Sequence, residues 1–129
     1  MENEQPVIKI GIVDDEMLIV QLLDDFFSKT KGISVVLKAY DGKQVIEQLE
    51  TAEVMPDIVL LDLRMKEMDG VETTTILRER YPDIKIIVMS SHYMSTFMGY
   101  MLKTGVNAFI PKEISPDFLV HPHRPFFVP

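Results

Sequence analysis

Three aspartates and one lysine follow apolar, β-branched runs, and these residue types could together bind a metal ion and an anion. The placements are Asp14 and Asp15 after residues 7–13, Asp62 after residues 58–61, and Lys112 two residues after residues 106–110. If the runs are parallel neighbours in one sheet, the charges meet at its carboxyl edge, where open α/β sheets bind ligands. Carboxylates that close repel one another, so such a site normally holds a divalent cation. The lysine indicates an accompanying anion, and the pattern predicts a magnesium-dependent module that accepts a phosphoryl group.

The elements that must place these residues alternate along the chain. Apolar runs at about 7–13, 33–39, 57–61, 84–89 and 106–110 predict five strands. Helical spacing between these runs predicts four helices. The first carries Leu18, Leu22 and Phe26 on one side, with Ile19 and Leu23 beside them, and the second opens at Asp41-Gly42. The third runs from about Val71 to Tyr81, and the fourth from about Ser95 to Thr104 before Gly105. This order predicts an α/β fold, a doubly wound, five-stranded parallel sheet with helices on both faces.

The C-terminal residues break this regularity. Ser115-Pro116 has the form of a helix start, but Pro122, Pro125 and Pro129 follow closely. Because proline inside a helix costs about 3 kcal/mol, the last helix is expected to be shortened or disrupted. We therefore expect one domain over residues 1–120 and a proline-rich tail over residues 121–129.

Bulk composition excludes several classes of function. Twenty acidic against thirteen basic residues give a net charge of −7 over 129 residues, which argues against direct nucleic-acid binding by this chain. With no cysteine, thiolate metal sites and cysteine nucleophiles are excluded. The acidic N-terminus is unlike a signal peptide, and no apolar run approaches the roughly 20 residues that span a bilayer. Together these features predict a cytoplasmic protein that does not enter a membrane.

The motifs, taken in order, resemble the receiver domain of two-component response regulators over about residues 7–118. The resemblance rests on Asp14-Asp15, on Asp62 at the head of residues 62–70, on Ser90, and on residues 109–112, which read Phe-Ile-Pro-Lys. It implies the flavodoxin-like strand order 2-1-3-4-5. It also implies a switch whose chemistry is phosphoryl acceptance and slow self-catalysed loss of that group, without sustained enzymatic turnover.

Roles at the site follow from the same resemblance. Asp62 would accept a phosphoryl group from a sensor histidine kinase, forming an acyl phosphate. Asp15 would bind Mg²⁺ directly and Asp14 mainly through water, with Asp62 and the backbone carbonyl of Arg64 as the other protein ligands. Lys112 would contact a phosphoryl oxygen as a point charge.

The resemblance also implies residues that read out and tune the modification. Ser90 would donate its hydroxyl to the phosphoryl group, and Phe109 would turn inward as Ser90 moves. Arg64 and His92 hold positions, two residues after Asp62 and Ser90, that would tune the lifetime of the phosphoryl group.

Two departures from the family pattern indicate which type of receiver the chain resembles. Lys66 and Glu113 stand where many receivers have proline. A lysine-glutamate pair at 112–113 resembles receivers that precede helix-turn-helix output domains of the NarL/LuxR type. Too few residues follow Glu113 for such a domain, so we expect either a stand-alone receiver or a fragment of a longer regulator of transcription. In either case the receiver would control a partner or an attached output domain.

An uncharged stretch predicts self-association. Residues 93–102 contain no charged side chain and are apolar around more than one face of the expected helix. With a stunted last helix beside it, this surface would be exposed. We expect a homodimer through residues 93–110 and the C-terminal tail.

Two other classes of protein stay open at this point. A phosphatase of the haloacid-dehalogenase class also uses a strand-end aspartate and Mg²⁺, but it needs an aspartate where Arg64 stands. A receiver-like interaction module that is never phosphorylated would normally have lost an acidic or lysine position, and none is lost here. A flavin-binding domain is disfavoured because Asp14-Asp15-Glu16 would repel the flavin phosphate.

Overall fold

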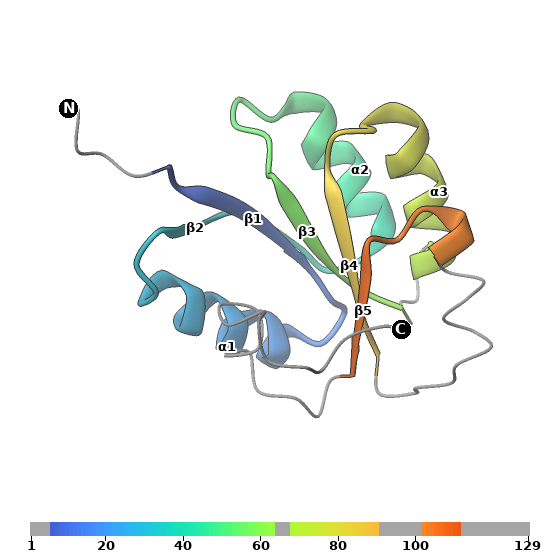
Figure 1. Ribbon diagram of the computed structural model, residues 1–129. Coiled ribbons are helices and arrows are strands. Elements are labelled where there is room, and N and C mark those ends of the chain that lie inside the picture. Colours follow the sequence, from blue (N-terminus) through green and yellow to red (C-terminus); the bar gives the residue numbers. More distant parts are fainter. Residues whose placement is uncertain (1–5, 64–67, 91–101, 112–129) are drawn as a thin grey trace.

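A five-stranded parallel sheet organises the chain (Figure 1). The computed structural model describes residues 6–63, 68–90 and 102–111. Its elements are β1 (Ile8–Val13), α1 (Met17–Ser28), β2 (Ile33–Ala39), α2 (Gly42–Thr51), β3 (Ile58–Asp62), α3 (Gly70–Arg80), β4 (Lys85–Ser90) and β5 (Ala108–Pro111). The strand order is β2-β1-β3-β4-β5, and every neighbouring pair is parallel. The predicted fold class and strand order are confirmed.

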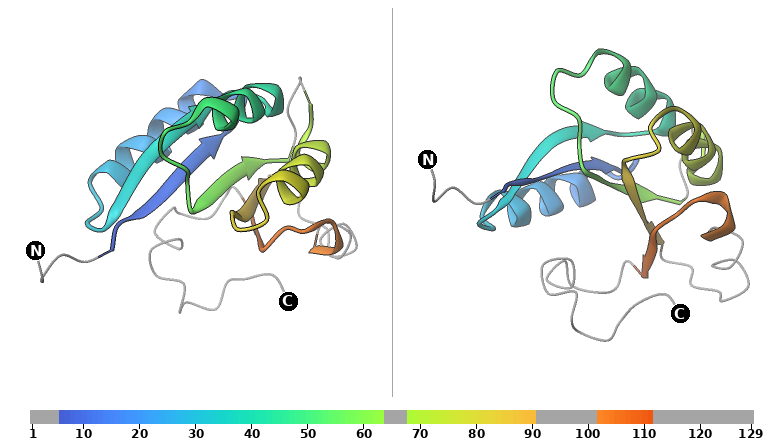
Figure 2. Two further views of the ribbon diagram at one scale, coloured as in Figure 1. Left: turned by 90° about the horizontal axis from the view of Figure 1, so that it is seen from above. Right: turned by 45° about the horizontal axis from the view of Figure 1, so that its top comes forward.

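The strands are apolar on both sides because helices cover both faces of the sheet. In Figure 2, α1 lies on one face, and α2 and α3 lie on the other. Side chains at alternating strand positions divide accordingly: Ile10, Ile12 and Leu60 pack with α1, whereas Val59, Leu61 and Val88 pack in the cluster beneath α2 and α3. These two cores lie on the two faces of the sheet. Because all the strands run in the same direction, their carboxyl ends lie along one edge.

Helix α1 buries a different stripe from the one that starts at Leu18. Its buried side chains are Val20, Leu23 and Phe27, and the rings of Phe26 and Phe27 meet edge to face at 5.2 Å between centroids. Leu18 and Leu22 are 70% and 55% exposed. Because six of the first seven positions of α1 are apolar, spacing alone does not distinguish the face that meets the sheet.

Helices α2 and α3 begin with the same pair of residues, aspartate followed by glycine. Asp41 accepts a hydrogen bond from Gln44 N at 2.7 Å, and Asp69 accepts one from Glu72 N at 2.9 Å. These are N-caps, each of which satisfies a backbone donor at a helix start. Glu16, at the same place before α1, makes no such side-chain bond.

The outer edge of the sheet at β2 is met by side chains from α2. Gln48 Nε2 donates to the Lys38 carbonyl at 2.9 Å, and Tyr40 N donates to Gln44 Oε1 at 2.9 Å. Lys38 Nζ also reaches Asp24 of α1 at 3.2 Å. Both helices therefore hold the last residues of this edge strand.

The strand boundaries fall within two residues of the predicted ones. The expected fourth helix is described only over residues 102–104, which are helical and end at Gly105 as predicted. The shortened last helix, the tail and residues 93–101 of the 93–110 surface lie outside the described residues. Among the helices that the structure describes, none combines the length and the apolar character that crossing a bilayer requires.

Candidate functional site

Two buried aspartates lie side by side at the carboxyl edge of the sheet. The β1–β3 register pairs Val13 with Leu61, so the next residues along these adjacent strands are Asp14 and Asp62. Neighbouring parallel strands are roughly 4.8 Å apart. Asp14 is 0% exposed and Asp62 is 4% exposed. The register thus places these two aspartates next to each other at the ends of the first and third strands.

A second group of acids surrounds Asp14 at the turn from β1 to α1. Carboxylate oxygens of Asp14, Asp15 and Glu16 all lie within 4.8 Å of one another. Glu16 N donates to Asp14 Oδ1 at 2.9 Å, which fixes the orientation of the Asp14 carboxylate. Asp14 N in turn donates to the Ala39 carbonyl at 3.2 Å, tying the start of the turn to β2.

The donor set at this turn fits magnesium. All three side chains offer oxygen, which Mg²⁺ prefers, and the ion needs only one or two direct carboxylate ligands. Burial of two like charges at Asp14 and Asp62 is costly unless positive charge compensates it, and a divalent cation would provide that charge. Glu16 was not assigned a role from the sequence. Its contact with Asp14 through the backbone is the feature that draws it into the group.

The residues after Asp62 leave the sheet in a loop that returns to it. Leu63 N donates to the Met89 carbonyl at 3.1 Å, which extends the β3–β4 ladder by one residue. Gly70 N donates to the Leu63 carbonyl at 2.9 Å, so both ends of the 63–70 loop meet directly behind Asp62. Met68, near its end, has a φ of 61°, a left-handed conformation that is uncommon outside glycine.

The other predicted switch residue, Phe109, lies in β5. It is 1% exposed and packs in the core cluster on the α2–α3 face, and its backbone pairs with Val88 of β4. Ser90 and Pro111 form the last pair of the β4–β5 ladder, at the same edge as Asp14 and Asp62. Lys112 follows Pro111 directly.

Several residues with predicted roles lie outside the part of the chain that the structure describes. They are Arg64, His92 and Lys112, together with the side chain of Ser90. Their roles, and the metal-ligand role of the Arg64 carbonyl, stay predictions.

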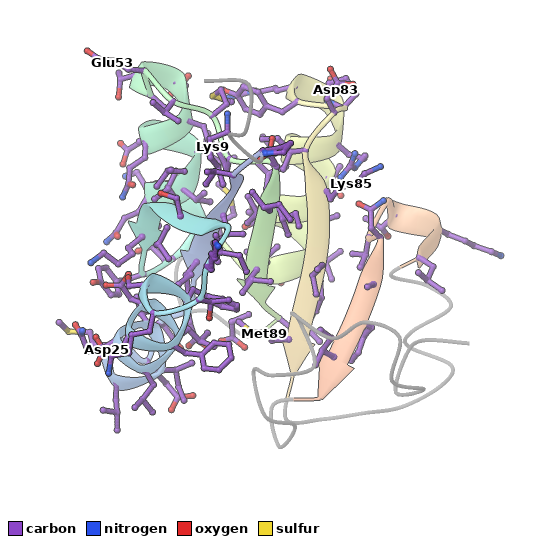
Figure 3. All side chains as sticks on the ribbon, turned by 60° about the vertical axis from the view of Figure 1, so that its left-hand side comes forward. Lys9, Asp25, Glu53, Asp83, Lys85 and Met89 are labelled. Atoms are coloured by element: carbon purple, nitrogen blue, oxygen red, sulfur yellow. The ribbon has the colours of Figure 1, made fainter. Side chains whose placement is uncertain are left out.

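One hollow in the described residues lies at the opposite edge of the sheet. It has a volume of about 890 Å³ and lies between the connections that precede β3 and β4, with Lys9, Asp57 and Tyr81 among its lining residues. Figure 3 shows Lys9, Asp83 and Lys85 at this amino edge and Met89 near the other end of β4. The candidate site is therefore not in this hollow. It lies at the carboxyl ends of the strands, where open α/β sheets bind ligands.

Comparison with known proteins places this arrangement in a family. Residues 10–123 match the family model described as the response regulator receiver domain. The chain is 34% identical over 113 residues to the transcriptional regulatory protein DegU of Brevibacillus brevis, an alignment that covers 88% of this chain and 47% of the relative. It is 33% identical over 108 residues to the response regulator protein VraR of Staphylococcus saprophyticus, covering 84% of this chain and 51% of that protein.

Solved structures agree with the sequence comparison. The receiver domain of the Francisella response regulator 1452 superposes with a TM-score of 0.79 at 26% identity, covering 92% of this chain and 93% of that one. The chain spans about half the length of the two curated relatives but nearly all of this isolated receiver domain. With the sheet order, the paired strand-end aspartates and these matches in agreement, the chain belongs to the response regulator receiver domain family.

Proposed function

We propose that this chain accepts a phosphoryl group on Asp62 from the phosphohistidine of a sensor histidine kinase, in a reaction that requires Mg²⁺. The observation that carries the proposal is the burial of Asp62 beside Asp14 at the carboxyl edge of β1 and β3. A phosphoryl donor would have to approach the Asp62 carboxylate from the open carboxyl edge of the sheet.

The transfer needs little from the protein beyond placement and charge. An oxygen of Asp62 forms a bond to phosphorus while the phosphorus–nitrogen bond of the phosphohistidine breaks, and the departing imidazole keeps the electron pair and takes a proton from water. Asp14, Asp15, Asp62 and the Arg64 carbonyl would hold the ion, with Glu16 as a further candidate near Asp14. Bound Mg²⁺ would supply positive charge against the phosphoryl oxygens.

The direct test is covalent modification by a small phosphodonor. Incubation with acetyl phosphate and Mg²⁺ should add one phosphoryl group, seen by mass spectrometry as an adduct that is stable in acid and labile in base. Asp62→Asn should abolish the adduct. Asp57→Asn is the matched control, because Asp57 directly precedes the same strand at its other end and should leave labelling unchanged. An adduct that persists in Asp62→Asn would contradict the assignment.

The consequence of modification would be a change at the β4–β5 edge. In this proposal Ser90 and Lys112 contact the phosphoryl group and Phe109 responds, while Arg64 and His92 set its lifetime. The placement of Ser90 and Pro111 as the last β4–β5 pair supports a common location.

The output would lie in a partner or in further chain. One relative of about twice the aligned length is named a transcriptional regulatory protein, which supports a role in transcriptional control for the protein to which this domain contributes. Homodimer formation through residues 93–110 and the tail would be the route by which the switched surface acts.

A further inference from the structure

The loop after Asp62 is held at its base by an unusually close contact of two backbone segments. Gly70 begins α3, and its N–H bonds to the Leu63 carbonyl at 2.9 Å. A Cβ atom at position 70 would lie 2.8 Å from Leu63 Cα and 2.9 Å from the Asp62 carbonyl oxygen. Real Cβ atoms essentially never approach other atoms so closely, and both neighbours are backbone. Any larger residue at position 70 must therefore displace the backbone that carries Asp62.

A second glycine, at the start of α2, lies against the end of the same loop. Gly42 is the first residue of α2, and a Cβ atom there would lie 2.5 Å from the Met68 carbonyl oxygen and would overlap Thr73 Oγ1. Thr73 Oγ1 donates to the Asp69 carbonyl at 2.7 Å and lies 3.2 Å from the Met68 carbonyl. Gly42 of α2 therefore lies against the Met68 carbonyl and against the buried, hydrogen-bonded side chain of Thr73 in α3.

The backbone between these two contacts is strained. Met68 is the only non-glycine residue with a positive φ in the described part of the chain. Such a conformation is uncommon outside glycine and persists only where the surroundings impose it. Here Gly42 and Thr73 lie against its carbonyl, and the Asp69 cap of α3 follows directly.

We propose that Gly42 and Gly70 are positioning residues for phosphoryl acceptance, which set the location of Asp62 and of the loop that follows it. The inference rests on the proposed function of Asp62. Neither glycine touches the phosphoryl group. Because neither glycine has a Cβ atom, the loop can lie closer to the residues that hold it. The carboxylate of Asp62 then meets Asp14 at the geometry that transfer requires. Misplacement by about 1 Å can cost on the order of 100-fold in rate.

The test compares three alanine substitutions in the whole chain. Gly70→Ala and Gly42→Ala should each lower the rate of adduct formation by about tenfold or more at saturating acetyl phosphate and should weaken Mg²⁺ binding. Gly11→Ala is the matched control, since its Cβ would meet the flexible end of Leu37 at 3.2 Å in the core, away from the loop. It should lose stability with a labelling rate within about twofold of the unsubstituted chain. Urea unfolding at the assay temperature shows that each variant is folded.

A rescue experiment separates positioning from a general loss of structure. Thr73→Ala removes the atom that overlaps the new Cβ in Gly42→Ala, so the double variant should recover part of the lost rate. If Gly42→Ala and Gly70→Ala both label as fast as Gly11→Ala, the inference is wrong. It is also wrong for Gly42 if the double variant labels no faster than Gly42→Ala alone.

Hydrogen exchange tests the same inference independently of phosphorylation. In the absence of Mg²⁺ and phosphodonor, the amides at positions 63 and 70 should exchange faster in Gly70→Ala than in Gly11→Ala, because their bonds form the base of the loop. Unchanged exchange at both amides would overturn the positioning role. If the unsubstituted chain fails to label while this exchange difference appears, the proposed function fails and the loop support stands.

Discussion

At the scale of single residues, the environment of Asp14 matters most. Carboxylates are rarely fully buried unless something compensates their charge, and here one lies beside a second on the neighbouring strand. At a separation of about 4.8 Å, the general spacing of neighbouring parallel strands, Coulomb repulsion between two charges amounts to roughly 3 kcal/mol at an effective dielectric constant near 20. Binding a cation would relieve such repulsion, so an arrangement that weakens the empty site would strengthen metal binding.

Neutralising Asp14 should therefore have opposite effects on folding and on metal binding. Asp14→Asn keeps an Oδ1 acceptor for Glu16 N and removes one negative charge. Without Mg²⁺ the variant should be more stable by about 1–3 kcal/mol, measured by urea unfolding. Titration of Mg²⁺ should show affinity reduced by at least about tenfold. Lower stability without metal would show that repulsion from Asp14 is outweighed by its attractive contacts.

At the scale of elements, α1 shows which side chains a helix needs for folding and which it does not. Leu22 and Leu23 are adjacent in sequence, yet Leu22 is 55% exposed and Leu23 is buried with Val20 and Phe27. Leu23→Ala should cost about 2–5 kcal/mol, because it leaves a cavity against the sheet. Leu22→Ala should change stability by less than about 0.5 kcal/mol. Urea unfolding of both variants measures the difference, and comparable losses would place both leucines in the core.

The elements themselves were predictable because each carries a redundant signal. Five apolar runs between helical stretches allow few arrangements other than a parallel sheet, and Asp41 and Asp69 mark two helix starts by their caps. The buried face of α1 was not predictable, because its apolar residues fit more than one helical face. These residues are Met17, Leu18, Ile19, Leu22 and Leu23. The contacts of Gly42 and Gly70 were also beyond reach, because they join residues that only the folded chain brings together.

The candidate site, like the elements, could be predicted only in part. The place of Asp14 and Asp62 at one edge of the sheet could be predicted, because strand ends in a parallel sheet share one edge. Glu16 follows Asp15 directly in the sequence, but its backbone bond to Asp14 forms only in the folded chain.

At the scale of the whole molecule, metal binding should report on folding. Asp14 and Asp62 meet only when β1 and β3 pair, so the unfolded chain lacks the site. At a Mg²⁺ concentration about 100 times the dissociation constant, stability should rise by about 2.7 kcal/mol. Asp57→Asn should keep this gain and Asp62→Asn should lose most of it, measured as shifts of the urea midpoint. An equal gain in both variants would mean that the ion binds elsewhere.

The side-chain amides at the edge of β2 have a consequence for encounters between molecules. An exposed edge strand offers its backbone groups to any other extended chain and so invites aggregation. Gln48 occupies the Lys38 carbonyl, and Gln44 occupies Tyr40 N. A foreign strand arriving at this end of β2 would have to displace both amides before it could pair. The two glutamines of α2 would thus hinder pairing at this end of the edge strand, a role separate from the proposed metal and phosphoryl chemistry.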